Sequence, residues 1–325
     1  MPSLALFALD ASADLGQAVA RDLWVTLAPH EERAFEDGEH KIRPLDSVEG
    51  ADVYVIQSLH AGPEQGVADK LCRLLFFIGA LKDSGAARVT AVTPYLCFAR
   101  KDRRTKPRDP VTIRYLAAMF ESVGTDAIIT LDVHNPAAFE NAFRCRTISA
   151  TAAPLFINYA KRLDVERLAV ISPDTGGAKR AELLREALEA AQGKPVGKGF
   201  VEKHRSAGVV SGDLFVGDVA DATALIVDDL ISTGTTLVRA AKAAREAGAH
   251  HVLAMVTHGL FMPGAEKAIT DPAIDRVVVT DSVPPFRLDS VAAREKLIEL
   301  PIAPLLAEII RRLHGGQALA DLLIF

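Results

Sequence analysis

Cysteine, tryptophan and excess positive charge are scarce in this chain of 325 residues. It has three cysteines and one tryptophan, and 37 Lys and Arg residues against 42 Asp and Glu residues give a formal net charge of −5. The cysteine spacings match no CxxC or metal-binding pattern, so we expect packed free thiols in a reducing cytoplasm. Without a basic excess to displace counterions, we expect no nonspecific nucleic-acid binding, although a local basic pocket for phosphates fits this charge.

Long apolar segments are also absent. The longest uncharged apolar runs, such as LLFFIGAL at residues 74–81, are far shorter than the roughly 20 residues that cross a membrane. The first residues, MPSLALFALDASADLG, lack a basic region followed by a long apolar stretch, so we expect no signal peptide and no membrane partner. The sequence contains no G-x-x-x-x-G-K-[ST] motif, which excludes a Walker A phosphate loop.

The composition is that of a globular protein, with 49% apolar and 24% charged residues. Short segments rich in Val and Ile alternate with amphipathic helical stretches, which predicts an α/β fold of parallel sheets covered by helices. The predicted strands are 4–9, 52–57, 88–95, 126–131, 167–172, 223–229, 251–258 and 275–281. The predicted helices are 64–83, 112–122, 176–191 and 235–247.

The length corresponds to two domains, and the eight predicted strands divide into two halves. No low-complexity linker marks the boundary, so the strand pattern alone places it. We expect an N-terminal domain of residues 1–150 and a C-terminal domain of residues 151–325, with a late amphipathic helix at 301–316.

The clearest chemical pattern lies at residues 223–249, TALIVDDLISTGTTLVRAAKAAREAGA. A buried strand ends in two adjacent carboxylates, Asp228 and Asp229, and a loop of small residues then opens an Ala-rich helix. Small residues let backbone N–H groups converge on an anion, and the helix N-terminus adds its positive end. Carboxylates beside such a loop can accept hydrogen bonds from sugar hydroxyls, so the segment predicts a sugar-phosphate site; the alternative is a capped helix after an acidic strand end. The loop residues are Ser232, Thr233, Gly234, Thr235 and Thr236.

The segment VDDLISTGTTL resembles the phosphoribosyl-pyrophosphate loop of type I phosphoribosyltransferases. Further segments resemble, in the same order, those of the ribose-phosphate pyrophosphokinases, also called phosphoribosyl-pyrophosphate synthetases. They are RAFEDGE (33–39), FARKDRR (98–104), PRDPVTIRYLAAMFESVGTDAIITLDVHN (107–135), ISPDTGGAKRAE (171–182), VEKHRSAG (201–208) and VTHGLF (256–261). Several independent matches in order indicate a divergent member of that family.

This resemblance implies two tandem type I phosphoribosyltransferase-like domains, each a mostly parallel sheet flanked by helices. It also implies transfer of the β,γ-diphosphoryl group of Mg-ATP to the 1-hydroxyl of ribose 5-phosphate, giving phosphoribosyl pyrophosphate and AMP, with Mg²⁺ as the cofactor. Because the polyphosphate is strongly anionic, this transfer needs cations and in-line positioning more than covalent catalysis.

The resemblance further implies a role for individual residues. Lys203 and Arg205 are the catalytic cations of a flap, on alternate positions of a predicted strand. His134 and Asp174 hold the magnesium, although His134 can instead hydrogen-bond a phosphate or a bound water, because imidazole is an unusual ligand for Mg²⁺. Ribose 5-phosphate is bound by Asp228, Asp229 and the loop 232–236. The ATP-binding residues are Phe35, Asp37, Glu39, Arg100, Lys101, Asp102 and His134.

Assembly follows from the N-terminal match. In the family, the hairpin that corresponds to residues 33–39 reaches the ATP site of a neighbouring subunit, where Phe35 would stack on adenine. The resemblance therefore implies self-association, as a dimer or a larger assembly such as a hexamer. It also implies that residues of about 303–325 pack on the first domain.

Two other functions remain open from the sequence. A phosphoribosyltransferase that consumes phosphoribosyl pyrophosphate would use the same loop, but the ATP-like stretch and the length argue against it. A non-catalytic regulatory homologue would lose the flap cations or the acids that follow the strands. The chain retains Lys203, Arg205, His134 and Asp174, which favours an active enzyme.

Overall fold

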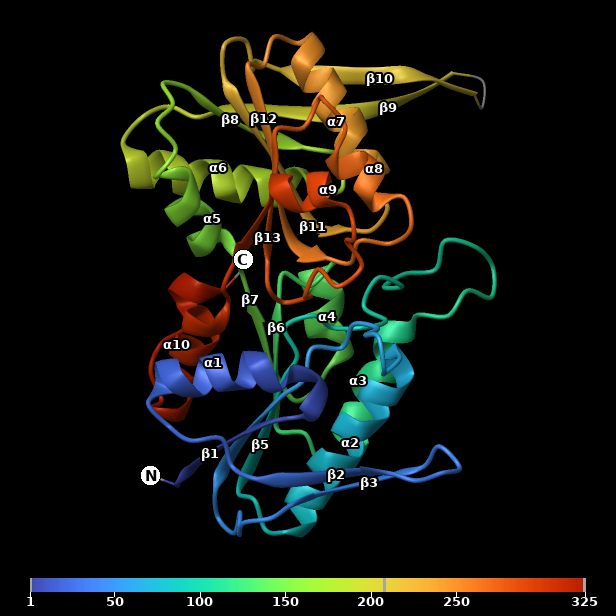
Figure 1. Cartoon of the computed structure of the whole chain (residues 1–325), viewed down its shortest axis with the longest axis vertical. Coiled ribbons are helices and arrows are strands. Elements are labelled where there is room, and N and C mark those ends of the chain that lie inside the picture. The colour runs from blue at the N-terminus through green and yellow to red at the C-terminus, as the bar shows by residue number, and fades with distance from the viewer. Residues whose placement is uncertain (1, 207–208, 324–325) are drawn as a thin grey trace. The chain divides into compact units, whose positions relative to one another are not determined.

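The computed structural model describes residues 2–206 and 209–323, without the side chains of residues 202–206 and 209–213. The chain forms two compact units (Figure 1). The first contains the residues up to Thr151 together with those from Ile302 onward, and the second contains Ala152–Pro301. The chain thus leaves the first unit once and returns to it at its C-terminal end.

A five-stranded parallel sheet forms the centre of the first unit, in the order β1-β4-β5-β6-β7. Its central strands are buried along their whole length, which explains their continuous runs of Val, Ile and Ala. The strands are β1 (Leu4–Ala8), β4 (Asp52–Ile56), β5 (Arg88–Val92), β6 (Ala127–Leu131) and β7 (Arg146–Ala150).

Helices cover both faces of this sheet (Figure 1). One face packs against α2, α3 and α4 through a core that includes Phe77, Phe120 and Phe139. The other face lies under α1 and α10, which contact each other. The helices are α1 (Ala13–Leu23), α2 (Val67–Asp83), α3 (Thr112–Ser122), α4 (Pro136–Ala142) and α10 (Ala303–His314), with short 3₁₀ turns η1 (Asp10–Ser12) and η2 (Ala320–Leu322).

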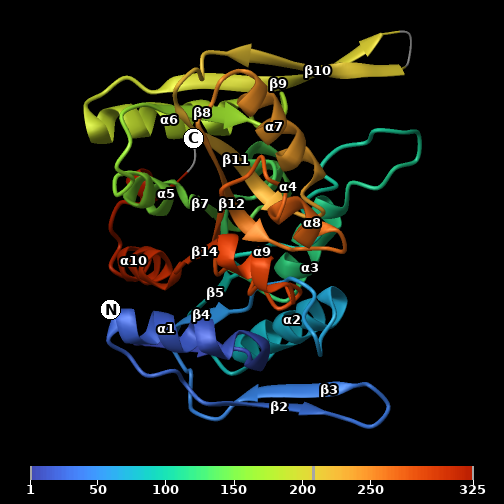
Figure 2. The ribbon, with the colours of Figure 1, turned by 45° about the horizontal axis from the view of Figure 1, so that its top comes forward.

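Two short strands leave the first unit as an antiparallel hairpin, β2 (His30–Ala34) and β3 (His40–Pro44). Figure 2 shows this hairpin beside α2, with its turn projecting outward. The strands consist mostly of charged residues and histidines, HEERA and HKIRP, and only Ile42 of β3 is fully buried. The hairpin therefore projects from the first unit, and its turn, residues 35–39, is exposed to solvent.

The second unit has a seven-stranded sheet in the order β10-β9-β8-β11-β12-β13-β14. All neighbours are parallel except β9 and β10, which form a long antiparallel pair at one edge. The strands are β8 (Leu168–Ser172), β9 (Gly197–Ser206), β10 (Val209–Gly217), β11 (Thr223–Ile231), β12 (His251–Gly259), β13 (Arg276–Thr280) and β14 (Leu297–Leu300). The helices are α5 (Ala153–Ala160), α6 (Ala178–Gln192), α7 (Thr235–Glu246), α8 (Ala265–Ile269) and α9 (Val291–Lys296).

The predicted α/β fold class is confirmed, and each predicted strand and helix has its counterpart within a few residues. The pattern did not predict α1, the strands β7, β10 and β14, or the helices α4, α5, α8 and α9. The strand β7 reads RTISA, with three polar residues, so its apolar pattern is too weak to recognise.

Candidate functional site

The carboxylates and the small-residue loop of the second unit lie at the carboxyl end of β11, where ligands bind in open α/β sheets. Strand pairing continues past Asp228 to Ile231, two residues beyond the predicted end. Ser232, Thr233 and Gly234 then lead into α7, and Thr235 is its first residue. The hydroxyls of Thr233 and Thr235 are hydrogen-bonded at 3.1 Å. Hydroxyl groups and the first N–H groups of α7 are thereby gathered at one point, as an anion site requires.

Gly234 makes this turn possible. Its φ is +77°, in the left-handed region, and a Cβ added to it would lie 2.5 Å from the Cβ of Ala268. A side chain is therefore excluded both by the backbone conformation and by the close approach of α8. The loop is also held by hydrogen bonds from the backbone N–H groups of Leu260 and Met262 to the carbonyls of Ile231 and Ser232.

A cation joins the two carboxylates. The guanidinium Nη1 of Arg180, in the first turn of α6, lies 3.2 Å from Oδ1 of Asp229 and 3.6 Å from Oδ1 of Asp228. Burial and the neighbouring Asp229 carboxylate raise the pKa of Asp228, and Arg180 opposes that rise. Arg180 belongs to the segment ISPDTGGAKRAE, and no local pattern indicates that its partners, Asp228 and Asp229, lie about 50 residues further along the chain.

Asp174 follows β8 and lies just before α6. Its Oδ1 accepts hydrogen bonds from the backbone N–H groups of Gly176 and Gly177 at 2.9 and 3.1 Å, and the Ser172 hydroxyl donates to its carbonyl. The carboxylate is half-buried and held in one orientation. A hard, oriented oxygen donor of this kind suits Mg²⁺.

In the first unit, the predicted nucleotide residues lie on the loop between β5 and α3. Arg100 is exposed on this loop. The Lys101 amine instead donates to Asp109 Oδ2 and to the Thr105 hydroxyl, which also donates to Asp109. The hydrogen bond from Lys101 is the main reason why the pKa of Asp109 lies well below its usual range. Lys101 therefore closes this loop from within.

The loop that follows β6 is joined to the same region. The Asn135 side chain caps α4 through Ala138 N–H and donates to the Asp102 carboxylate at 2.5 Å. Asp132, two residues before the exposed His134, is buried with φ of +39°, a conformation that few non-glycine residues adopt. Of the sequence-predicted residues, Asp102 and the loop of His134 are thus brought together, and Asn135 was missed as the link between them.

Phe35, Asp37 and Glu39 all lie in the exposed turn of the β2–β3 hairpin. The Asp37 carboxylate accepts from the Glu39 N–H at 3.0 Å, and the Arg33 guanidinium lies 5.2 Å from the centroid of the Phe35 ring. The ring is 40% exposed, so an aromatic surface is presented to solvent at the end of the hairpin.

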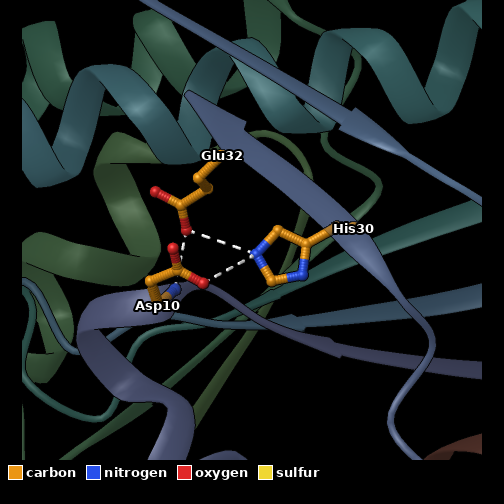
Figure 3. A group of neighbouring side chains, drawn as sticks. All are labelled: Asp10, His30 and Glu32. Atoms are coloured by element: carbon orange, nitrogen blue, oxygen red, sulfur yellow. Dashed lines mark hydrogen bonds and ion pairs between the residues drawn. The ribbon is translucent and has the colours of Figure 1, made fainter. Parts of the chain in front are cut away.

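An ion-pair cluster fixes the base of the hairpin. Figure 3 shows Asp10, His30 and Glu32 pointing toward one another, with potential ligand atoms all within 4.8 Å. Glu32 Oε1 accepts from Asp10 N at 2.6 Å and from His30 at 3.3 Å, and Arg73 of α2 donates to Oε2 at 3.3 Å. Burial raises the pKa of Glu32, but these hydrogen bonds outweigh it and lower the pKa overall. Both oxygens of Glu32 accept hydrogen bonds, and these bonds join the hairpin to η1 and α2.

The predicted flap residues Lys203 and Arg205 lie in β9, where the backbone pairs residue 203 with residue 213 of β10. Their side chains lie outside the part of the chain that the structure describes. Among the described residues, no helix has the length and apolar character needed to span a membrane.

A loop of small and hydroxyl-bearing residues, at the carboxyl end of a central parallel strand and beside paired carboxylates, lies where proteins with open α/β sheets bind their ligands. Comparisons with known proteins identify the family to which this chain belongs. Residues 4–124 match the family model for the N-terminal domain of ribose phosphate pyrophosphokinase, and residues 209–324 match the model for the phosphoribosyl synthetase-associated domain.

Curated relatives extend over almost the whole chain. The ribose-phosphate pyrophosphokinases of Haemophilus ducreyi and Vibrio cholerae are each 34% identical, covering 98% of this chain and 98% and 99% of their own lengths. The crystal structure of phosphoribosylpyrophosphate synthetase from Mycobacterium smegmatis superposes with a TM-score of 0.85 at 32% identity, over 97% of this chain and 99% of that one. The chain belongs to the ribose-phosphate pyrophosphokinase family and is an enzyme of that family.

Proposed function

We propose that this chain transfers the β,γ-diphosphoryl group of ATP to the 1-hydroxyl of ribose 5-phosphate, which gives phosphoribosyl pyrophosphate and AMP. The observation that carries the proposal is the Gly234 loop beside Asp228 and Asp229, in a chain aligned with ribose-phosphate pyrophosphokinases over 98% of its length. In this transfer, the anomeric oxygen attacks the β-phosphorus, the bond from that phosphorus to the α,β-bridging oxygen breaks, and AMP leaves with that oxygen.

We assign the sugar phosphate to the second unit. The 5-phosphate binds at residues 232–236, where backbone N–H groups and threonine hydroxyls are gathered at the start of α7. The ribose hydroxyls donate to Asp228 and Asp229. The alternative of a merely capped helix is less favoured, because the Gly234 turn has no side chain that caps α7.

We assign ATP to the first unit and to the hairpin. Arg100 contacts the nucleotide directly. Asp102 and the loop of His134, which Asn135 joins by a hydrogen bond, line the same side of the nucleotide site. Phe35 stacks on adenine, with Asp37 and Glu39 beside it. The Lys101 amine is engaged with Asp109 and Thr105, which supports a role for Lys101 in shaping the ATP loop. Lys203 and Arg205 neutralise charge on the transferred group.

Magnesium fits the donors that the chain offers. The oriented, half-buried Asp174 carboxylate supplies the hard oxygen that Mg²⁺ prefers, and the His134 imidazole would bind either the metal or a phosphate. When bound, the metal neutralises the polyphosphate and orients it. The exposed aromatic turn of the hairpin supports self-association, in which Phe35 serves a neighbouring copy. Three free cysteines support a cytoplasmic location.

The experiment is a coupled assay of AMP formation with purified protein. We expect AMP only when ATP, Mg²⁺ and ribose 5-phosphate are all present. A protein that releases no AMP, but consumes phosphoribosyl pyrophosphate with a nucleobase and without ATP, would be a phosphoribosyltransferase. A protein inactive in both assays would be a non-catalytic homologue.

A further inference from the structure

The paired carboxylates at the end of β11 depend on one cation from another element. Asp229 is 4% exposed, and its neighbour Asp228 is half-buried. Arg180 reaches both from α6, and Asp228 Oδ1 also accepts from the Asp229 N–H at 2.9 Å. One oxygen of each carboxylate is thereby fixed, which sets the orientation of both groups.

Arg180 affects the two carboxylates through its charge as well as through packing. Two adjacent carboxylates shielded from water repel each other, and one of them tends to retain a proton unless a cation lies beside them. A protonated carboxyl group becomes a donor and loses acceptor capacity. The guanidinium of Arg180 reduces this repulsion and favours the acceptor form of both groups, although burial and Asp229 still raise the pKa of Asp228 to about 8.

We propose that Arg180 is a positioning residue for ribose 5-phosphate, and that it orients Asp228 and Asp229 to accept hydrogen bonds from the ribose hydroxyls. This inference rests on the sugar-phosphate assignment proposed above. Arg180 acts through the two carboxylates, and the sugar itself touches the carboxylates.

The charged side chains of the two helices that contact β11 are Lys179, Glu182, Arg185, Glu186 and Glu189 on α6, besides Arg180, and Arg239, Lys242, Arg245 and Glu246 on α7. The strand β8 carries no charged residue, and His258 of β12, beside Leu230, is hydrogen-bonded to the Ser282 hydroxyl at 2.8 Å. On α7, Lys242 and Arg245 pair with Asp271 and Asp275. On α6, Arg185 pairs with Glu182 and Glu189.

The test compares Arg180→Met with Arg185→Met, a control on the same helix that also removes an ion-paired arginine. We expect Arg180→Met to raise the KM for ribose 5-phosphate about 10- to 100-fold, as expected for the loss of a charged hydrogen bond, with the KM for Mg-ATP changed less than about threefold. Arg185→Met should leave both values unchanged.

The pH profile separates positioning from simple structural damage. Without the guanidinium, the carboxylates ionise at higher pH, so the acid limb of kcat/KM for ribose 5-phosphate should shift upward by one pH unit or more in Arg180→Met. Arg180→Lys retains the charge without the planar fork. It should keep the wild-type acid limb while its KM rises about three- to tenfold.

Three results would overturn the proposal. They are an unchanged sugar KM in Arg180→Met, an equal rise in both substrate KM values, and a wild-type acid limb in that variant. If Arg180→Met does not fold, a wild-type sugar KM in Arg180→Lys would overturn it instead. Failure of the underlying assignment looks different, since wild-type protein would then form no AMP from ATP and ribose 5-phosphate.

Discussion

Replacing Gly234 by alanine tests the geometry of the phosphate loop most sharply. The left-handed backbone at φ +77° costs a non-glycine residue about 1–2 kcal/mol. The added Cβ would also lie 2.5 Å from the Cβ of Ala268, and such overpacking costs about 1–3 kcal/mol more. We therefore expect Gly234→Ala to lower the unfolding free energy of its unit by about 2–5 kcal/mol. It should also raise the KM for ribose 5-phosphate about tenfold, because the loop amides move.

Gly193 offers a matched control. Its φ is +67°, and nothing lies within 4 Å of a Cβ added there, so Gly193→Ala has the backbone cost of about 1–2 kcal/mol alone. Urea unfolding of both variants, compared at the same transition, measures the difference. Adding Ala268→Gly to Gly234→Ala removes the clashing atom and should recover about 1–3 kcal/mol as a coupling energy. Equal stability of Gly234→Ala and Gly193→Ala, with no coupling to position 268, would refute the reasoning.

Three further variants test other parts of the account. Lys203→Ala should lower kcat at least 100-fold while Mg-ATP binding by calorimetry stays near wild type, and unchanged turnover would remove Lys203 from the mechanism. In the folded protein, burial raises the pKa of Asp52, but hydrogen bonds, above all the one from Arg88, outweigh burial and lower the pKa. The contribution of Asp52 to the free energy of unfolding is therefore present above the ordinary pKa of 3.8, and it is lost as the pH falls through the lower pKa of the folded protein. Asp52→Asn should thus lower stability by about 2 kcal/mol at pH 7 and by much less near pH 2 in thermal melts, whereas an equal loss at both values would contradict this sign. Lys101→Gln should raise the KM for ATP several-fold, because it weakens the hydrogen bond to Asp109 that holds the loop between β5 and α3. If these hydrogen bonds to Asp109 are the cause, Asp109→Asn should raise the KM for ATP to a similar extent.

The parallel strands were predictable because their burial on both faces forces continuous apolar sequence, as in DVYVI of β4 and LAVIS of β8. The loop that we propose binds the sugar phosphate could be recognised for a related reason. A site for a sugar phosphate needs small residues, hydroxyls and carboxylates close together along the chain, and residues 228–236 provide them.

Features built from residues far apart in the sequence were not predictable. Nothing local indicates that Arg180 bridges Asp228 and Asp229, because that contact depends on how α6 packs beside β11. The return of the C-terminal segment to the first unit was expected from the family resemblance and not from the residue pattern. It is fixed in part by His314 of α10, whose Nδ1 lies 2.7 Å from an oxygen of Asp52, 262 residues earlier.

The identity of the transferred group tests the central claim most directly. Purified protein incubated with ATP, Mg²⁺ and ribose 5-phosphate can be followed by ³¹P nuclear magnetic resonance until substrate is consumed. We predict equal amounts of AMP and of a ribose carrying a 5-phosphate and a 1-diphosphate. Release of ADP with a monophosphate in place of the diphosphate on the 1-oxygen of ribose 5-phosphate, or no sugar product at all, would contradict the account.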